Sequence, residues 1–194
     1  MLIYKQIWHG IKLIRWLNKF NLTQAIQDHP KLLTIPLHTR WKAPMLGVYK
    51  ANVDGAVFKE QLTIGLDVII RNADGQVIGA LSQQIYAPLG AFEAKAIEAT
   101  VLFARDVGIQ EIIFKGDFLQ VYNFLKGGSL VPLVANMLEG ILYHLQTFHS
   151  FDFSHIKRVG NRPAYLLAHH AKSVVDFEAW VEETPSFLEA ACNT

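Results

Sequence analysis

Residues 48–56, Val-Tyr-Lys-Ala-Asn-Val-Asp-Gly-Ala, are the stretch around which the rest of the chain is organised. The pattern indicates a buried strand that delivers the carboxylate of Asp54 to an end loosened by Gly55. An aspartate in such a place is most often a turn former. Two further acidic residues in matching positions, Glu93 and Asp117, change the interpretation, because three carboxylates at three element ends suggest a magnesium site.

The composition limits the classes of protein that fit. The chain has 194 residues, of which 51% are hydrophobic, enough for one α/β domain of about 150 residues with flanking segments. With a net charge of +1, the chain lacks the excess of basic residues that many nucleic-acid-binding proteins have, so any contact with nucleic acid must be local. Cys192 is the single cysteine, which excludes an intrachain disulfide and fits a reducing compartment.

The first forty residues are expected to form a helix and a linker. Isoleucines recur at helical spacing from Ile3 to Ile14, but lysine and arginine between them argue against a secretory signal. No stretch has the roughly 20 apolar residues of a membrane span. A basic amphipathic helix on a membrane surface is one interpretation, and a helix that docks on the domain is another.

Strands and helices are then predicted from the change of hydrophobic period. Apolar runs at 62–70 and 77–81, separated by a turn with Asn72 and Gly75, predict a hairpin that joins the Asp54 strand in an antiparallel meander. Helical spacing follows from residue 91 to Gly108. Later elements are a strand at 109–115, a helix at 118–125, a helix from Val131 with Pro132 in its first turn, a strand at 151–155 and a helix from Asn161 toward Val175.

Ordinary structural roles exist for two of the three carboxylates. Glu93 lies in the first turn of its predicted helix, where a negative charge interacts favourably with the helix dipole. Asp117 follows a strand and precedes a helix, which is the usual place of an N-cap aspartate. Both roles are compatible with metal binding.

Several blocks occur in an order and spacing that resemble the type 1 ribonuclease H domain in its plant reverse-transcriptase-like branch. The blocks are RWKAP (40–44), NVDGA (52–56), IIRN (69–72) with DG (74–75), FEA (92–94) with Glu98, GDFLQV (116–121), RVGNR (158–162) and EETPSFL (182–188). The resemblance runs from about Arg40 to the end of the chain. The segment before it is similar to the linker that joins such domains to an upstream retrotransposon polymerase.

The resemblance implies an α/β, ribonuclease H-like fold. Its sheet has five strands, three antiparallel and then parallel ones, flanked by helices. We expect an N-terminal helix and linker at 1–40, the ribonuclease H-like domain at 41–178 and a C-terminal tail at 179–194. The implied activity is hydrolysis of the RNA strand of RNA–DNA hybrids, by a monomer without membrane contact whose location, nuclear or cytoplasmic, stays open.

The family's metal ligands fall on Asp54, Glu93 and Asp117 of this sequence. The resemblance implies Mg²⁺ or alternatively Mn²⁺, because two such ions can clamp the attacking and leaving oxygens of a phosphodiester displacement. Asp54 would bridge both metals. The fourth carboxylate of the family falls on Tyr165, and a phenol is a poor magnesium ligand.

Substrate contact is assigned to the cations Lys157, Arg158 and Arg162, which gather beside the proposed site. A solvated loop is the alternative for each of them. The loss of the fourth carboxylate also leaves a second function open: a catalytically impaired domain that binds nucleic acid or a protein partner. His169 and His170, on the last helix, are expected to be surface or packing residues.

Overall fold

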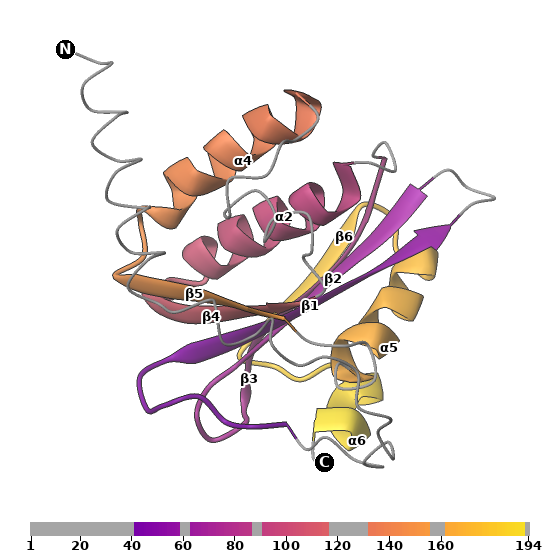
Figure 1. Cartoon of the computed structure of the whole chain (residues 1–194). Helices are drawn as coiled ribbons and strands as arrows, with labels where there is room; N and C mark the ends of the chain where they lie inside the picture. Colours follow the sequence, from indigo (N-terminus) through magenta and orange to yellow (C-terminus); the bar gives the residue numbers. More distant parts are fainter. Residues whose placement is uncertain (1–40, 59–62, 87–90, 117–131, 156–161, 193–194) are drawn as a thin grey trace, which may run out of the picture. The chain divides into compact units, whose positions relative to one another are not determined.

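A mixed β-sheet lies at the centre of the structure, which is a computed structural model that describes residues 41–58, 63–86, 91–116, 132–155 and 162–192 (Figure 1). All of these residues belong to the unit His38–Thr194. The expected N-terminal helix at 1–40 and the expected helix at 118–125 lie outside the described residues.

The sheet combines an antiparallel half with a parallel half. The described strands are β1 (Tyr49–Phe58), β2 (Thr63–Arg71), β3 (Val77–Ile85), β4 (Glu111–Gly116), β5 (Ser150–His155) and β6 (Phe177–Val181). Their order is β5-β4-β1-β2-β3-β6, with β4 parallel to both β1 and β5 and the other neighbours antiparallel. The predicted α/β class and the antiparallel-then-parallel arrangement are therefore confirmed.

The sheet has six strands within the described part of the chain, so the expected number of five is wrong. The additional strand is β6, which pairs antiparallel with the outer edge of β3. Trp180 is half-buried while the other four residues of β6 are exposed, so the strand shows no apolar alternation from which to predict it. Residue 179, where the tail was expected to begin, lies inside β6.

The β2–β3 hairpin closes as the sequence predicts. The Asn72 carboxamide oxygen accepts hydrogen bonds from the backbone N–H groups of Asp74 and Gln76, at 3.0 and 2.9 Å. Gly75 has a φ of 82°, which a glycine adopts without steric cost. The turn chemistry thus fixes the register that aligns β2 with β3.

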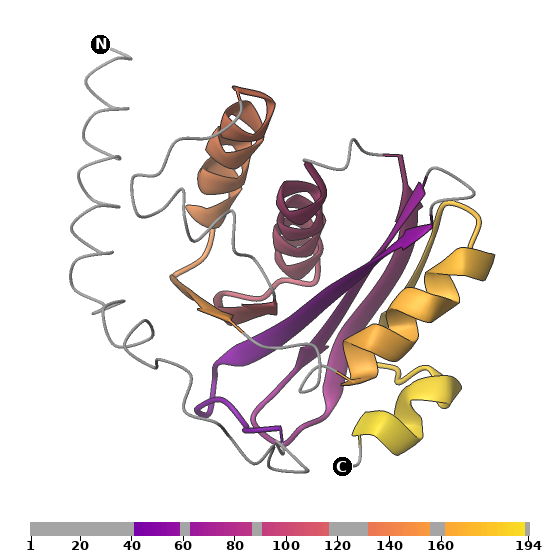
Figure 2. The ribbon, with the colours of Figure 1, turned by 45° about the vertical axis from the view of Figure 1, so that its right-hand side comes forward.

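Helices cover both faces of the sheet (Figure 2). One face carries α2 (Phe92–Asp106) and α4 (Pro132–Leu145); the other carries α5 (Arg162–His170), followed by the short helices η4 (Ala171–Ser173), η5 (Ser186–Leu188) and α6 (Glu189–Cys192). The starts of α2 and α4 agree with the predicted ones. All nine residues of β2 are buried, because this central strand is covered on both faces.

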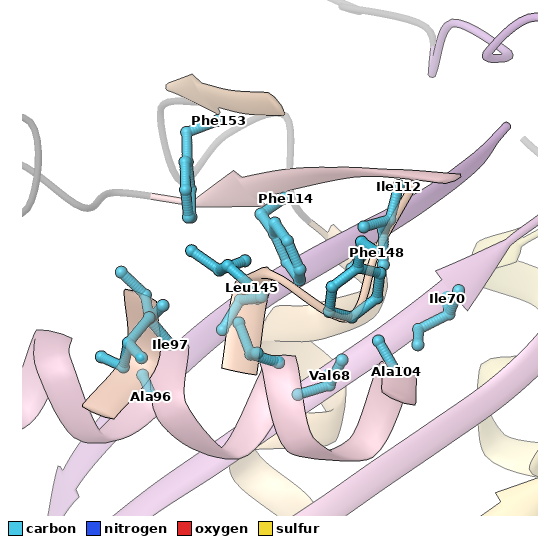
Figure 3. Close-up of a cluster of buried hydrophobic side chains, with 14 of the residues drawn as sticks. Val68, Ile70, Ala96, Ile97, Ala104, Ile112, Phe114, Leu145, Phe148 and Phe153 are labelled. Carbon is cyan, nitrogen blue, oxygen red and sulfur yellow. The ribbon is translucent and has the colours of Figure 1, made fainter. Parts of the chain in front are cut away.

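The larger hydrophobic core lies between the sheet and the pair α2 and α4 (Figure 3). Phe114 of β4 stacks on Phe153 of β5 with ring centroids 5.2 Å apart, and it meets Phe148 edge-on at 5.9 Å. A smaller cluster lies on the opposite face, where Ile69 of β2 packs with Ala164 and Leu167 of α5. Asp54 lies on this second face, because side chains alternate along β1 and those of Ala51 and Val53 belong to the larger core.

Candidate active site

Asp54 lies just beyond the point where the parallel pairing of β1 with β4 ends. The pairing of β1 with β4 runs only from Tyr49 to Asn52, so Asp54 is two residues beyond the last paired position. The strand itself continues to Phe58, and the expectation that Asp54 ends it is wrong. Gly55 still matters, because its N–H donates to the Asp54 Oδ1 at 2.9 Å. The carboxylate is half-buried and lies at the carboxyl ends of parallel strands, where ligands bind in open α/β sheets.

Gly55 also brings the start of α2 against β1. A Cβ atom at position 55 would lie 2.0 Å from Cζ of Phe92, so the aromatic ring occupies the space that a side chain would need. Phe92 is the first residue of α2 and Glu93 the second. The contact therefore places the first turn of α2, with Glu93, beside the Asp54-Gly55 segment.

Glu93 sits in a first turn that has no side-chain cap. Ala91 is the N-cap residue and offers no side-chain hydrogen bond to the helix N–H groups. A carboxylate in this turn is favoured by the helix dipole, as the sequence suggested. Whether its oxygens converge with those of Asp54 stays a prediction.

The other predicted site residues are not described by the structure, or are described without their side chains. Asp117 follows Gly116, the last residue of β4, and is outside the described residues together with Lys157 and Arg158. Arg162 and Tyr165 lie in helix α5, where only their backbone is described.

A carboxylate that the sequence interpretation missed, Asp67, lies directly opposite Asp54. The two residues are Cα partners in the antiparallel β1–β2 pairing, so their side chains leave the same face of the sheet. Asp67 has 0% of its surface exposed, and among the residues that the structure describes neither of its carboxylate oxygens has a partner at hydrogen-bond geometry. Ser82 is the next residue in the row, but its hydroxyl donates at 3.4 Å to the Leu167 carbonyl of α5.

The surroundings of Asp67 disfavour its charged form. Burial raises its pKa from 3.8 to about 8; the nearby Ser82 hydroxyl opposes the rise, and the negative charge of Asp54 adds to it. The signal that could have revealed this residue is an aspartate inside the apolar run Ile64–Ile70, because a buried carboxylate is costly unless something compensates for it. The run was interpreted only as a buried strand.

A group of cations on the same face was also missed. Lys50, Asn52 and Asp54 alternate along β1 and so share one face. Arg71 of β2 donates to the Asn52 carboxamide oxygen at 3.4 Å, and Lys115 of β4 is the Cα partner of Asn52. The acidic pair and this cationic group, which consists of Lys50, Arg71 and Lys115, lie side by side on the sheet.

The cationic group is held without an acidic partner. Lys50 donates to the Lys42 carbonyl oxygen, and the Arg71 guanidinium stacks 4.2 Å from the centre of the Trp41 ring. Burial and the neighbouring cations lower the pKa of Lys50 to about 8, and they also lower the pKa of Lys115. In the described ranges, none of the three cations forms an ion pair with a carboxylate. An anion from outside the chain would relieve this repulsion.

Carboxylate oxygens of this kind suit a hard divalent cation. The two orphan oxygens of Asp67, opposite Asp54, are donors of the type that Mg²⁺ and Mn²⁺ take. Among the residues that the structure describes, no three His, Cys, Asp or Glu side chains are grouped closely enough to hold a metal ion. Asp117 is outside the described residues.

The two histidines of α5 have structural surroundings. His170 stacks on Phe187 with ring centroids 4.6 Å apart, and its Nε2 lies 2.9 Å from a carboxylate oxygen of Glu178. His169 is exposed. His170 thus connects α5 with β6 and η5, in agreement with the packing role expected for it.

Comparison with known proteins gives a family and a fold. The sequence model of the family described as reverse transcriptase-like matches residues 52–171. RNase H1 from the halophilic archaeon Halobacterium salinarum NRC-1 is similar in structure, with a TM-score of 0.58 and 23% identity over 65% of this chain and 98% of that chain. The N-terminal RNase H domain of a Mycobacterium tuberculosis protein has a TM-score of 0.57 and 20% identity, over 65% of this chain and 94% of that chain.

A third structure, LC11-RNase H1, was solved in complex with an RNA/DNA hybrid. It has a TM-score of 0.55 and 18% identity, over 63% of this chain and 94% of that chain. These likenesses confirm the ribonuclease H-like fold, while the plant branch stays a prediction. Comparison with curated protein sequences gave no match. Within the described ranges, no helix has the length and hydropathy needed to span a membrane.

Proposed function

Because the chain belongs to the reverse transcriptase-like family, we propose that its ribonuclease H-like domain is a metal-dependent endonuclease that cleaves the RNA strand of RNA–DNA hybrids. The observation that carries this proposal is the position of Asp54. It lies just beyond the β1–β4 pairing, with the first turn of α2 packed beside it through Phe92 and Gly55. Glu93 is the second residue of α2 and Asp117 follows β4 directly in sequence, so we expect both carboxylates at this end of the parallel strands.

Each carboxylate has a defined task in this proposal. Asp54, Glu93 and Asp117 would hold Mg²⁺, or Mn²⁺ in its place, through oxygen ligands. When bound, the ion would lower the pKa of the attacking water and stabilise charge that develops on the phosphate oxygens. The backbone N–H of Gly55 holds one Asp54 oxygen, which orients the carboxylate.

The distribution of charge on the α5 face supports a polyanionic substrate. Lys115 of the cationic group pairs with Asn52, which lies two residues from Asp54 along β1, a separation of about 7 Å of strand. Phosphates of a nucleic-acid backbone are the groups that lysine and arginine commonly bind. A strand whose scissile phosphate lies at Asp54 would carry a neighbouring phosphate past Lys115, the half-buried cation of the group, while the buried Lys50 and Arg71 would add positive potential beneath it.

Tyr165 favours a second candidate function. A tyrosine stands at the position where the resemblance places the fourth carboxylate. Without that ligand the domain would bind nucleic acid through the cationic group and cleave it slowly or not at all. This candidate is a nucleic-acid-binding or protein-binding module that has kept the fold.

The decisive experiment is a cleavage assay on labelled RNA–DNA hybrid with Mg²⁺, Mn²⁺ or EDTA. Duplex RNA, duplex DNA and single-stranded RNA serve as controls for substrate class. We expect cleavage of the RNA strand of the hybrid that requires metal and is abolished by Asp54→Asn. Binding of the hybrid without cleavage at any metal concentration would favour the module. Cleavage that survives both EDTA and Asp54→Asn would contradict the site.

A further inference from the structure

We propose that Asp67 is an additional metal-ligating residue, which shares one divalent cation with Asp54 across the β1–β2 pairing. This inference rests on the proposed function and adds a ligand to its metal site. It starts from two buried oxygen atoms that the fold leaves without hydrogen-bond partners.

The strand register brings the two carboxylates within reach of one ion. Asp54 and Asp67 are Cα partners, and partners in an antiparallel pair have Cβ atoms about 5 Å apart on the same face. Oxygen ligands lie about 2.0–2.6 Å from Mg²⁺ or Ca²⁺, so one ion between two such side chains can touch both. Neither side chain needs to leave its strand for this.

The cost of burying Asp67 requires a compensating group. Its surface exposure is 0%, and the one hydroxyl close to it, that of Ser82, lowers its pKa only in part and also donates at 3.4 Å to the Leu167 carbonyl. A buried polar atom without a partner destabilises the folded state, and more strongly when it is charged. The charge of Asp54 adds repulsion. A cation shared by both carboxylates removes the repulsion and satisfies the orphan oxygens together.

A purely structural role does not account for this residue. The cations of the same face, such as Arg71, lie further along the strands, with Ile69 between Asp67 and Arg71 on β2. None of them forms an ion pair with Asp67. An apolar or small side chain would fill the space under α5 without the cost of desolvation. The carboxylate is therefore explained by what it binds.

The test is calorimetry. The full-length parent protein and the variants Asp54→Asn, Asp67→Asn and Asp152→Asn are first stripped of metal, and each is then titrated with Mn²⁺. We expect Asp54→Asn to abolish binding and Asp67→Asn to weaken it about tenfold or more, because affinity depends on the number of charged ligands. Asp152→Asn is the control: Asp152 is half-buried, as Asp54 is, but it lies on β5 and its Oδ1 already accepts from the Phe153 N–H at 2.8 Å. The Asp152→Asn protein should bind Mn²⁺ with the affinity of the parent.

Each outcome decides between the possibilities. An Asp67→Asn protein with the affinity of the parent, beside an Asp54→Asn protein that has lost binding, would overturn the role of Asp67 and leave the proposed function intact. Absence of Mn²⁺ binding by the parent would overturn both. If Asp67→Asn fails to fold by circular dichroism, the same comparison with Asp67→Ser decides, because serine removes the carboxylate and buries less polar surface.

Discussion

Asp54 and Asp67 face each other across the β1–β2 pairing, on the side of the sheet that α5 covers. One of them is half-buried at the open end of the parallel strands, and the other is fully buried between β1 and β3. This juxtaposition joins the fold to the proposed chemistry, because two neighbouring carboxylates repel each other when both are charged and a shared cation would remove that repulsion.

The stability of the metal-free protein should fall as the pH rises from about 5 to 8. The folded pKa of Asp67 is raised from 3.8 to about 8, so between these values the folded state binds a proton that the unfolded state has lost. Its stabilising contribution is complete below the unfolded pKa and disappears as the pH passes the folded one. The slope would reach about 1.4 kcal/mol per pH unit.

Urea unfolding in EDTA at several pH values measures this slope. The difference between the parent and Asp67→Asn isolates Asp67 from the histidines, which titrate in both proteins. Asp67→Asn should gain relative stability steadily across the interval. Two parallel stability curves would show that Asp67 is ionised in the folded, metal-free protein.

Gly55→Ala should damage the site through Phe92. The added Cβ would lie 2.0 Å from the Phe92 ring, so the ring must move, and a shift of the first turn of α2 to make room would displace Glu93 with it. We expect a loss of about 1–3 kcal/mol in the free energy of unfolding, typical of overpacking, and weaker Mn²⁺ binding.

Gly140→Ala provides the matched control for that substitution. Gly140 lies inside α4, and apart from its chain neighbours and the backbone of its own helix no atom of the described residues lies within 4 Å of the Cβ position. Alanine there should stabilise the helix by about 0.5–1 kcal/mol and leave metal binding unchanged. Equal effects of the two substitutions would contradict the link between Gly55 and the site.

Lys115→Gln should weaken binding of a hybrid by removing one phosphate-binding charge. Lys115 is the half-buried member of the cationic group beside Asn52. Filter binding at several salt concentrations in Ca²⁺ should show lower affinity and a salt slope reduced by about one. Lys172→Gln, at an exposed position of η4, should behave like the parent. Identical salt slopes for all three proteins would remove the cationic group from the substrate path.

Much of the fold could be predicted because its signals are local. The hairpin around Asn72, the start of α2 and the parallel strands β4 and β5 follow from turn chemistry and hydrophobic period. Strand β6 could not be predicted, since it is an exposed edge strand that depends on pairing with β3. The place of Asp54 beside the start of α2 could be expected, but the partner of Asp54 on β2 could not, because register is a property of the folded sheet.

Tyr165→Asp should help most when Asp67 cannot act as a ligand. The resemblance places a carboxylate at position 165, in the first turns of α5, and an aspartate there is also favourable for the helix dipole. If Asp67 supplies ligand charge, adding Tyr165→Asp to the parent should lower the metal concentration needed for single-turnover cleavage only modestly. Adding it to Asp67→Asn should restore a larger share of the lost rate, because each carboxylate compensates for the absence of the other.

The four proteins of this double-mutant cycle are compared at a series of Mg²⁺ concentrations. Interaction between sites 67 and 165 shows as non-additive effects on the metal requirement, whereas independent sites give effects that add within about 0.5 kcal/mol. Additive effects would mean that the two positions do not serve the same ion. A folded Tyr165→Asp protein that is no faster in either background would show that something other than a missing ligand limits turnover. The nucleic-acid-binding module would then be the better account of this domain.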